Sequence, residues 1–191
     1  MIAMADPTSA TPATAAAARS PLAHRAAGLA AAGTSEVAFL AQVSLRLDAA
    51  LAARSPLDLP LAPNTWRATA GWEALWLGPD EWLVVAPPGE AAAVADALDR
   101  ALDGLHRSVV DVSANRAVVE LAGDGRADLL AEGCGLDLHP RAWRAGMCAQ
   151  TLLARAPVLL QEREAATRVF VRASFADHVV GWLHATARSR A

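Results

Sequence analysis

Hydrophobic and polar residues alternate along much of the chain, and this alternation predicts several β-strands. The longest alternating stretch runs from Ser35 to Asp48 and predicts one continuous strand with a single buried face. A second stretch runs from Ala117 to Leu121. Shorter β-branched or apolar runs predict strands at 109–112, 147–154, 157–161 and 167–173, and a brief strand and turn at 136–143. The chain is therefore rich in strands.

Tryptophan residues mark a predicted β-hairpin in the first half of the chain. Trp72 and Trp76 share one side of a strand, and Trp82 begins the returning strand. The sequence Gly-Pro-Asp-Glu at 78–81 contains residues that favour a tight turn between them. Trp76 and Trp82 would then pack as a cross-strand pair. Residues 57–67, before the hairpin, contain prolines and predict an irregular connection.

Two helices are predicted in the first half of the chain. A short helix spans 48–54 and is ended by the Ser-Pro pair that follows. A longer helix is indicated by Val94, Leu98 and Leu102, which recur at helical spacing and would form a buried stripe. Gly104 is predicted to end this helix.

Two further helices are predicted in the second half. The first covers Arg126–Glu132, with Asp124 as its N-cap and Gly133 as a left-handed residue at its end. The second closes the chain, and Ser174 and Asp177 have the spacing of a capping box at its start. Its apolar face is predicted to consist of Phe175, Val179, Trp182 and Leu183.

These elements define an α+β fold of two tandem ferredoxin-like layers. Each layer would be an antiparallel sheet with helices packed on one face. The folded domain is predicted to cover 35–191, with halves at 35–113 and 114–191. Residues 1–18 are rich in Ala, Thr, Pro and Ser and lack the basic and apolar regions of a signal peptide, which predicts a disordered tail. Residues 19–34 predict an N-terminal arm, either solvated or packed on a partner.

Charge and composition exclude several classes of function. The 191 residues carry a formal net charge of −3, so the chain lacks the basic character that nucleic acids or acidic membranes attract. No apolar run approaches the roughly 20 residues that span a membrane. Cys134 and Cys148 are too few for a metal site. Without a secretory leader, they predict reduced, buried thiols in a cytoplasmic protein.

Residue types found in catalytic sites are present, but their spacing does not favour catalysis. Asp111, Ser113 and His139 could supply an orienting acid, a nucleophile and a base, yet Ser113 lacks the glycine-flanked elbow that exposes a hydrolase serine. Cys134 or Cys148 could pair with His139, but no third, orienting residue stands at a recognisable spacing. We therefore expect no catalytic residue in this chain.

Phosphate and metal sites are also disfavoured. Gly123-Asp124-Gly125 lies between a strand and a helix, but Asp128 stands where a dinucleotide motif needs its third glycine. His178 and His184 are six residues apart, whereas a spacing of four brings two imidazoles to one metal. His106 falls at a helix exit, where it would favour the helix dipole. We expect no cofactor-binding or metal-ligating residue in this chain.

Tryptophan and arginine residues are candidates for contacts with other proteins, because these two types often dominate the binding energy of interfaces. Trp143 stands between Arg141 and Arg144 in the sequence. This position fits a protein interface as well as it fits the core. The tryptophan hairpin supplies the remaining candidates. The full set of interface candidates is Trp76, Asp80, Trp82, Arg141, Trp143 and Arg144.

Seven segments, in order, together resemble a known family. They are RSPLAHR (19–25), AQVSLR (41–46), WLGPDEWL (76–83), VVDVSANRAVVEL (109–121), GCGLDLHPRAW (133–143), CAQTLLARAPVLL (148–160) and RASFADHVVGWL (172–183). In this combination the chain resembles the gamma subunit of heterotetrameric sarcosine oxidase, from Arg19 onward. The resemblance implies a trimmed version of the folate-binding aminomethyltransferase fold.

The resemblance also implies a function, as a non-catalytic subunit of a four-chain enzyme. Such an enzyme oxidises sarcosine to glycine, passes the one-carbon unit to tetrahydrofolate and produces hydrogen peroxide. The implied partners are the alpha, beta and delta subunits, which would bind FAD, FMN, NAD, zinc and tetrahydrofolate. Two alternatives stay open: a stand-alone folate-binding aminomethyltransferase-like protein, and a stand-alone ligand-binding ferredoxin-like module.

Overall fold

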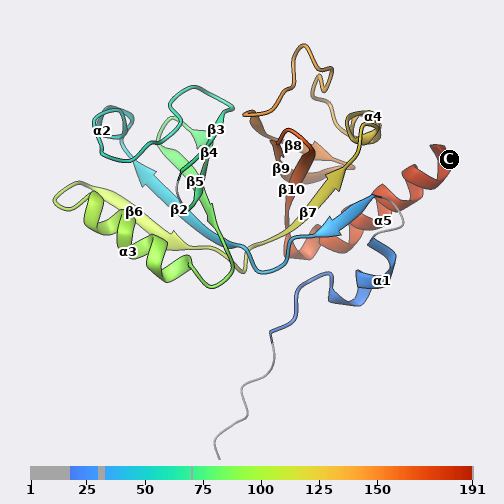
Figure 1. Ribbon diagram of the computed structural model, residues 1–191, viewed down its shortest axis with the longest axis horizontal. Helices are drawn as coiled ribbons and strands as arrows, with labels where there is room; N and C mark the ends of the chain where they lie inside the picture. The colour runs from blue at the N-terminus through green and yellow to red at the C-terminus, as the bar shows by residue number, and fades with distance from the viewer. Residues whose placement is uncertain (1–17, 30–32, 70, 191) are drawn as a thin grey trace, which may run out of the picture.

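The computed structural model describes residues 18–29, 33–69 and 71–190, which form two five-stranded antiparallel sheets with helices outside them (Figure 1). The first sheet has the strand order β3-β4-β5-β2-β6. Its strands are β2 (Ala41–Leu47), β3 (Trp66–Ala68), β4 (Glu73–Gly78), β5 (Glu81–Ala86) and β6 (Arg107–Asp111). We call it the β2 sheet.

The second sheet, which we call the β7 sheet, has the order β1-β7-β10-β9-β8. Its strands are β1 (Thr34–Glu36), β7 (Arg116–Ala122), β8 (Cys148–Leu153), β9 (Ala156–Glu162) and β10 (Ala166–Arg172). Every pairing in both sheets is antiparallel. The predicted α+β class, with two antiparallel layers and helices, is confirmed.

Helices cover the outer face of each sheet (Figure 1). They are η1 (Ala23–Arg25), α1 (Ala26–Leu29), α2 (Ala49–Ala52), α3 (Ala91–Ala101), α4 (Arg126–Ala131) and α5 (Ala173–Arg190). On the β2 sheet, Val94 and Leu98 of α3 join the same buried cluster as Val43 and Leu45. On the β7 sheet, an equivalent cluster is built from α4 and α5. The helical spacing predicted for α3 is confirmed, since Val94, Leu98 and Leu102 are all buried.

The inner faces of the two sheets pack on each other through a third hydrophobic cluster. Leu75, Leu83 and Val85 come from the β2 sheet, and Val118 and Phe170 come from the β7 sheet. Phe170 and Leu75 are completely buried there. Removing such side chains from water stabilises a fold by about 2 to 3 kcal/mol each. The two layers are therefore held together by burial, and they form one body.

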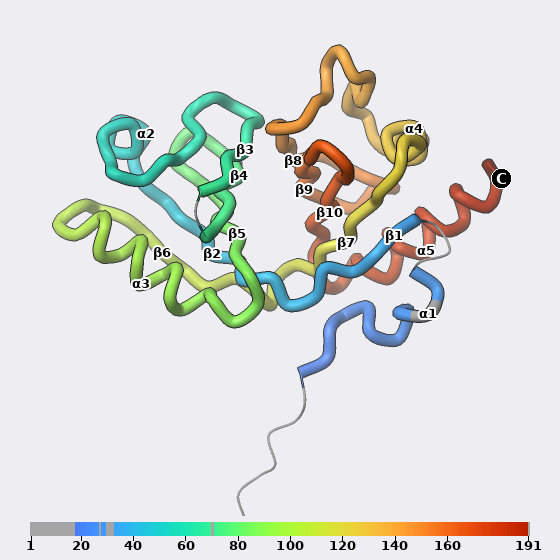
Figure 2. Tube along the Cα trace, in the orientation of Figure 1, coloured from blue at the N-terminus to red at the C-terminus, as the bar shows by residue number. Residues whose placement is uncertain are grey.

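The prediction of one continuous strand from Ser35 to Asp48 is wrong. The chain leaves the β7 sheet after β1 and enters the β2 sheet at β2, and Phe39 between them has a left-handed backbone with φ 61°. Figure 2 shows this link crossing between the sheets. The alternation continues through the break because Val37 still packs between the sheets. As a result, β1 belongs to the sheet of the second half, across the predicted division at 113/114.

Two short segments also differ from the prediction. The stretch 57–67 was expected to be irregular, but its last two residues open β3, which pairs with β4. Residues 136–143 were expected to contain a strand, and they form turns and coil instead. β3 was missed because its three residues are too few for the two-residue period of a strand to be recognised.

Helix ends account for most of the other differences. Gly104, with φ 74°, lies just beyond α3 as predicted. The predicted Asp124 cap is wrong, because α4 begins after Gly125 and has no side-chain cap. Gly133 is not in the left-handed region. The capping box of α5 is also wrong: the helix starts at Ala173, and the carboxylate of Asp177 binds the N-terminal arm instead.

The apolar face predicted for α5 is correct at three of its four positions. Val179 and Leu183 are completely buried, and Trp182 packs against the same cluster. Phe175, in contrast, is 40% exposed. Because Phe175 lies in the first turn, where the helix leaves the sheet, helical spacing alone does not reveal its exposure.

The N-terminal arm packs on its own chain. Leu22 and Leu29 are buried in the cluster beneath α5. The arm is therefore not a solvated leader, and its contact with a partner stays a prediction. The predicted tail, 1–18, lies outside the described residues except for Ala18. Within the described part of the chain, no helix is both long and apolar enough to cross a membrane.

Candidate functional site

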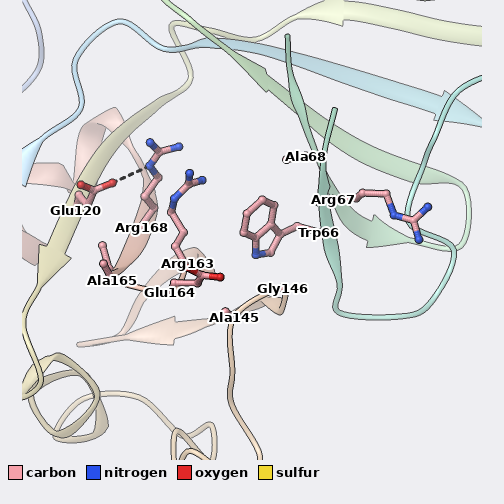
Figure 3. A pocket seen from close by; sticks show the side chains of 11 residues that line it. Trp66, Arg67, Ala68, Glu120, Ala145, Gly146, Arg163, Glu164, Ala165 and Arg168 are labelled. Atoms are coloured by element: carbon pink, nitrogen blue, oxygen red, sulfur yellow. Dashed lines mark hydrogen bonds and ion pairs between the residues drawn. The ribbon is translucent and has the colours of Figure 1, made fainter. Parts of the chain in front are cut away.

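A cavity of about 790 Å³ lies between β3, an edge strand of the β2 sheet, and the facing side of the β7 sheet (Figure 3). Trp66 to Ala68 of β3 form one wall, and the turn at 163–166 with Arg168 and Glu120 forms the other. A second cavity, of about 450 Å³, shares Ala68 and Arg168 with the first. The two cavities therefore adjoin, and we call them together the recess.

Glu73 of β4 is the centre of the charges in this recess. Its carboxylate accepts hydrogen bonds from Gln161 Nε2 at 2.8 Å, from Arg163 Nη1 at 2.5 Å and from Arg168 Nη1 at 3.3 Å. Arg168 also donates through Nε to Glu120 at 2.9 Å. The two carboxylates and two guanidinium groups cancel, so the recess is polar and close to neutral. Its ion pairs join β4 to the facing β7 sheet.

Trp66 forms the aromatic side of the recess. Its ring lies 5.1 Å from the guanidinium carbon of Arg163, which is the geometry of a cation–π contact. Its indole N–H donates to the carbonyl of Glu162 at 2.8 Å. The cation–π contact contributes about 0.5 to 2 kcal/mol, depending on its exposure. Trp66 is thereby fixed in position by the β7 sheet, although it belongs to the β2 sheet.

Behind the recess, the carboxylate of Glu162 is buried and takes three side-chain donors. Trp143 donates its indole N–H at 2.9 Å, Thr167 its hydroxyl at 2.5 Å, and Arg126 a guanidinium N–H at 2.8 Å. A buried carboxylate is stable only when its lone pairs are satisfied in this way. The Glu162 carboxylate on β9 therefore links α4, β10 and the turn that carries Trp143.

The sequence candidates for catalysis do not meet in this structure. Ser113 donates its hydroxyl to Asp111 at 2.6 Å, and its amide donates to the same oxygen, so the pair forms a turn. These two bonds lower the pKa of Asp111. His139 lies in another turn, where its Nδ1 accepts the amide N–H of Arg141. Within the described residues, Ser113 makes hydrogen bonds with Gln42 and Asp111 and with no histidine.

The two thiols are also held in structural contacts. Cys148 is buried, and its Sγ donates to the carbonyl oxygens of Thr65 at 3.2 Å and Trp76 at 3.5 Å. Burial raises the pKa of Cys148 to about 12, so the reactive thiolate is absent at neutral pH. Cys134 is half-buried and lies 3.7 Å from the hydroxyl of Thr151. Both are free thiols.

The histidines and the glycine-rich turn likewise have local roles. His178 Nε2 lies 2.9 Å from the carbonyl of Ala154, in the tight turn between β8 and β9. His184 lies 3.4 Å from Thr34 Oγ1, and burial lowers its pKa. The described residues contain no group of three potential metal-ligating side chains. Gly123, with φ 93°, simply turns the chain into α4.

The interface candidates separate into buried and surface residues. Trp82 is completely buried and donates its indole N–H to Pro60, and Trp143 is only 7% exposed. These two are core residues. Trp76 pairs with Trp82 across the hairpin, as predicted, and is half-buried.

The other three candidates lie at the surface: Asp80, Arg141 and Arg144 are exposed. Asp80 receives a bond from Arg46 at 3.3 Å. An interface role for these residues stays a prediction.

The residues that line the recess were missed by sequence reasoning. Glu73 and Arg168 are 95 positions apart, so no local motif joins them. Arg168 falls at an alternate position of β10, the pattern of a side chain that faces solvent. In the folded chain this face of β10 meets the other sheet, and Arg168 is only 16% exposed.

Together these features define a class: an α+β protein in which two helix-covered sheets enclose a neutral, internally paired polar recess. Comparison with known families identifies the group within this class. Residues 38–189 match the model of the "Sarcosine oxidase, gamma subunit family". The chain belongs to this family.

Individual relatives agree with the family match. The chain is 41% identical to sarcosine oxidase subunit gamma of Corynebacterium sp. (strain U-96), over 86% of this chain and 87% of the relative. It is 40% identical to the subunit of the same name from Arthrobacter sp., with the same coverage. The predicted resemblance is therefore confirmed.

Solved structures agree as well. The fold matches a chain of the heterotetrameric sarcosine oxidase from Corynebacterium sp. U-96 with a TM-score of 0.81 and 39% identity, over 90% of this chain and 95% of that chain. It also matches the glycine cleavage system aminomethyltransferase T from Bartonella henselae, with a TM-score of 0.63 and 16% identity, over 79% of this chain and 45% of that chain. The second match shows the fold alone, and its coverage fits the trimmed aminomethyltransferase fold predicted from the sequence.

Proposed function

We propose that this chain acts as the non-catalytic gamma subunit of a heterotetrameric sarcosine oxidase. The observation that carries the proposal is the match to a chain of that complex over 90% of this chain and 95% of the other. A match of nearly full length in both directions leaves no domain of either chain unpaired. The same body would therefore fill the same place in the assembly.

The proposed complex oxidises sarcosine to glycine, transfers the one-carbon unit to tetrahydrofolate and releases hydrogen peroxide. Its other members would be the alpha, beta and delta subunits, and we assign FAD, FMN, NAD, zinc and tetrahydrofolate to them. We place the complex in the cytoplasm. These assignments follow from the family and are proposals for this protein.

The chemistry of the recess supports a structural role. Its carboxylates and guanidinium groups bind one another, which leaves little freedom to exchange protons with a substrate. The buried thiol of Cys148 has a pKa of about 12 and is protonated at neutral pH. The same contacts fix the two sheets relative to each other. A rigid two-sheet body of this kind can present fixed surfaces to its neighbours.

The proposal predicts that the residues with catalytic side chains are dispensable for chemistry. We expect His139→Ala and Cys134→Ala, made in the complete four-subunit complex, to leave kcat and KM for sarcosine within about twofold of wild type. Loss of a general acid or base instead costs about 100-fold or more. The measurement is sarcosine-dependent hydrogen peroxide production per bound flavin.

The control is the amount of this chain in each purified complex, which should equal that of wild type. A fall of 100-fold in kcat with normal stoichiometry would show that the chain takes part in catalysis. Tight binding of folate to the purified chain alone would instead favour the stand-alone folate-binding alternative.

A further inference from the structure

Two arginines stand directly opposite each other on the inner face of the β7 sheet. Arg116 of β7 and Arg172 of β10 are register partners in the antiparallel ladder. Four residues along the same ladder, Glu120 and Arg168 are also register partners, and they form an ion pair at 2.9 Å. Like charges placed directly opposite each other destabilise a sheet. One end of this ladder is therefore charge-matched and the other is not.

The unmatched pair has no ion-pair partner within the described part of the chain. None of the ion pairs there includes Arg116 or Arg172. Arg172 donates only to the amide oxygen of Asn115, at 3.1 Å. Burial lowers the pKa of Arg116, and the neighbouring Arg172 lowers it further. Glu81 raises this pKa, although Glu81 does not form an ion pair with Arg116. A half-buried guanidinium in this situation is stabilised by an added carboxylate.

A small cavity of about 210 Å³ adjoins Arg116. Gln42 also lines it; this residue is completely buried, and its Oε1 has no hydrogen-bond donor in the described structure. Arg19 adds a further positive charge to the wall. Glu36 is the acidic residue of the lining, and its carboxylate already accepts the hydroxyl of Ser20 at 2.7 Å. The cavity wall thus carries two charged donors, Arg19 and Arg116, whereas the unpaired acceptor of Gln42 is shielded from solvent.

Two exposed phenylalanines lie near the charges, one in the lining of the same cavity and one close by along the chain. Phe39 lines the same cavity and is 53% exposed, with its backbone in the left-handed region at φ 61°. Phe175 is 40% exposed and lies three residues after Arg172, in the first turn of α5. Figures 1 and 2 show the β1–β2 link, the β6–β7 link and the start of α5 meeting below the junction of the sheets. Aromatic and arginine side chains are enriched at the energetic centres of interfaces.

We propose that these residues form a docking surface for an acidic segment of another subunit of the complex, which rests on the proposed function. We call it the Arg/Phe patch, defined by Phe39, Arg116, Arg172 and Phe175. A carboxylate of the segment binds between Arg116 and Arg172 and accepts hydrogen bonds from their guanidinium groups. A free carboxylate could satisfy only the arginines, whereas an acidic peptide also supplies an apolar surface for the phenylalanines.

The test compares the patch with an arginine elsewhere on the chain. All four subunits are co-expressed, the complex is captured by a tag on another subunit, and the dissociation rate of this chain is measured at several salt concentrations. We expect the double variant Arg116→Gln/Arg172→Gln to dissociate about 30-fold faster or more, because an interfacial carboxylate loses its partners. Arg100→Gln is the control, since Arg100 is exposed on α3, and we expect it to stay within twofold of wild type.

A second variant separates binding from folding. Phe39→Gly removes the ring and also relieves a left-handed backbone that bulky residues rarely adopt. We therefore expect the Tm of the chain to stay the same or rise, while the dissociation rate from the complex increases about tenfold, as for loss of an interfacial aromatic anchor. A residue that only supports the fold would lower Tm and leave the dissociation rate unchanged.

Each outcome separates the alternatives. Wild-type dissociation rates in both the double variant and Phe39→Gly overturn the proposal while leaving the proposed function intact. Failure of the wild-type chain to enter the complex overturns the proposed function and the docking partner together. If acetate raises the Tm of the wild-type chain but not of the double variant, and the dissociation rates do not change, the patch binds a small carboxylate and the partner proposal is wrong.

Discussion

At the scale of single residues, Gly133 shows that a glycine can be required by packing alone. The sequence suggested a left-handed residue at the end of α4, but the φ of Gly133 is not positive. A Cβ at this position would instead lie 2.6 Å from Trp182 Cζ2 and 3.2 Å from the backbone nitrogen of Ala154. Both neighbours are fixed, one in α5 and one in the β8–β9 turn. The close approach of these elements therefore excludes any side chain.

This contact predicts a specific loss of stability. We expect Gly133→Ala to lower the free energy of unfolding by about 1 to 3 kcal/mol, the usual cost of overpacking a fixed site. Gly135→Ala is the matched control, because a Cβ there meets nothing within 4 Å, and we expect a change below about 0.5 kcal/mol. Urea denaturation measures both. Equal effects of the two substitutions would show that contact with Trp182 does not limit this position.

Residues of the recess illustrate which part of the site a sequence can predict. The cross-strand pairing of Trp76 and Trp82 was predictable because the turn between them fixes the register. Glu73, by contrast, meets Arg163 and Arg168 only after the two sheets have packed. A charge at an alternate strand position looks the same whether it faces solvent or a second sheet. The recess therefore depends on tertiary structure that local patterns do not contain.

At the scale of elements, the N-terminal arm and α5 are joined by a charged contact. Asp177 accepts hydrogen bonds from Arg25 Nε at 2.5 Å and Nη2 at 2.8 Å, and lies 2.7 Å from His24 Nε2. Arg25, with a smaller contribution from His24, holds the pKa of Asp177 well below its ordinary value. Because the folded-state pKa is depressed, the contact stabilises the arm at all pH values above the ordinary carboxyl range. The stabilisation is lost as the pH falls through the lowered pKa.

The contact predicts the behaviour of the arm at neutral pH. We expect Asp177→Asn to increase amide hydrogen exchange of residues 18–29 roughly two- to fivefold at pH 7, because the local opening of the arm becomes easier. Asp96→Asn is the control, an exposed carboxylate on α3. Exchange of the β7 sheet should stay unchanged in both variants. If the arm exchanges at the wild-type rate in Asp177→Asn, burial of Leu22 and Leu29 alone holds it in place.

The elements themselves were predicted unevenly. Strands and helices with many periodic residues, such as β7 and α3, lie close to their predicted positions, because burial of one face requires a regular spacing. The break between β1 and β2 was missed, since the residues on both sides of Phe39 remain packed between sheets. The N-cap of α4 and the start of α5 were missed because Asp residues are used by turns and ion pairs as readily as by caps.

At the scale of the whole molecule, the fold joins two helix-covered sheets through one hydrophobic interface and one polar recess. The hydrophobic cluster between the sheets stabilises their association, and the ion pairs of Glu73 hold the two sheets in one position relative to each other. The links at 37–40 and 112–115 cross between the sheets at one end, and residues beside them form the Arg/Phe patch. Rigid layers and an exposed patch are what a subunit needs in order to hold a fixed place in a complex.

The central claim is that this chain works as one of four different subunits. Its most direct test is native mass spectrometry of the complex captured from the natural host by a tag on this chain, with a visible absorption spectrum of the same sample. We predict one copy each of four different chains, with flavin absorbance and sarcosine-dependent hydrogen peroxide production. A colourless chain that is recovered alone or as a homo-oligomer, with no such activity, would contradict the account.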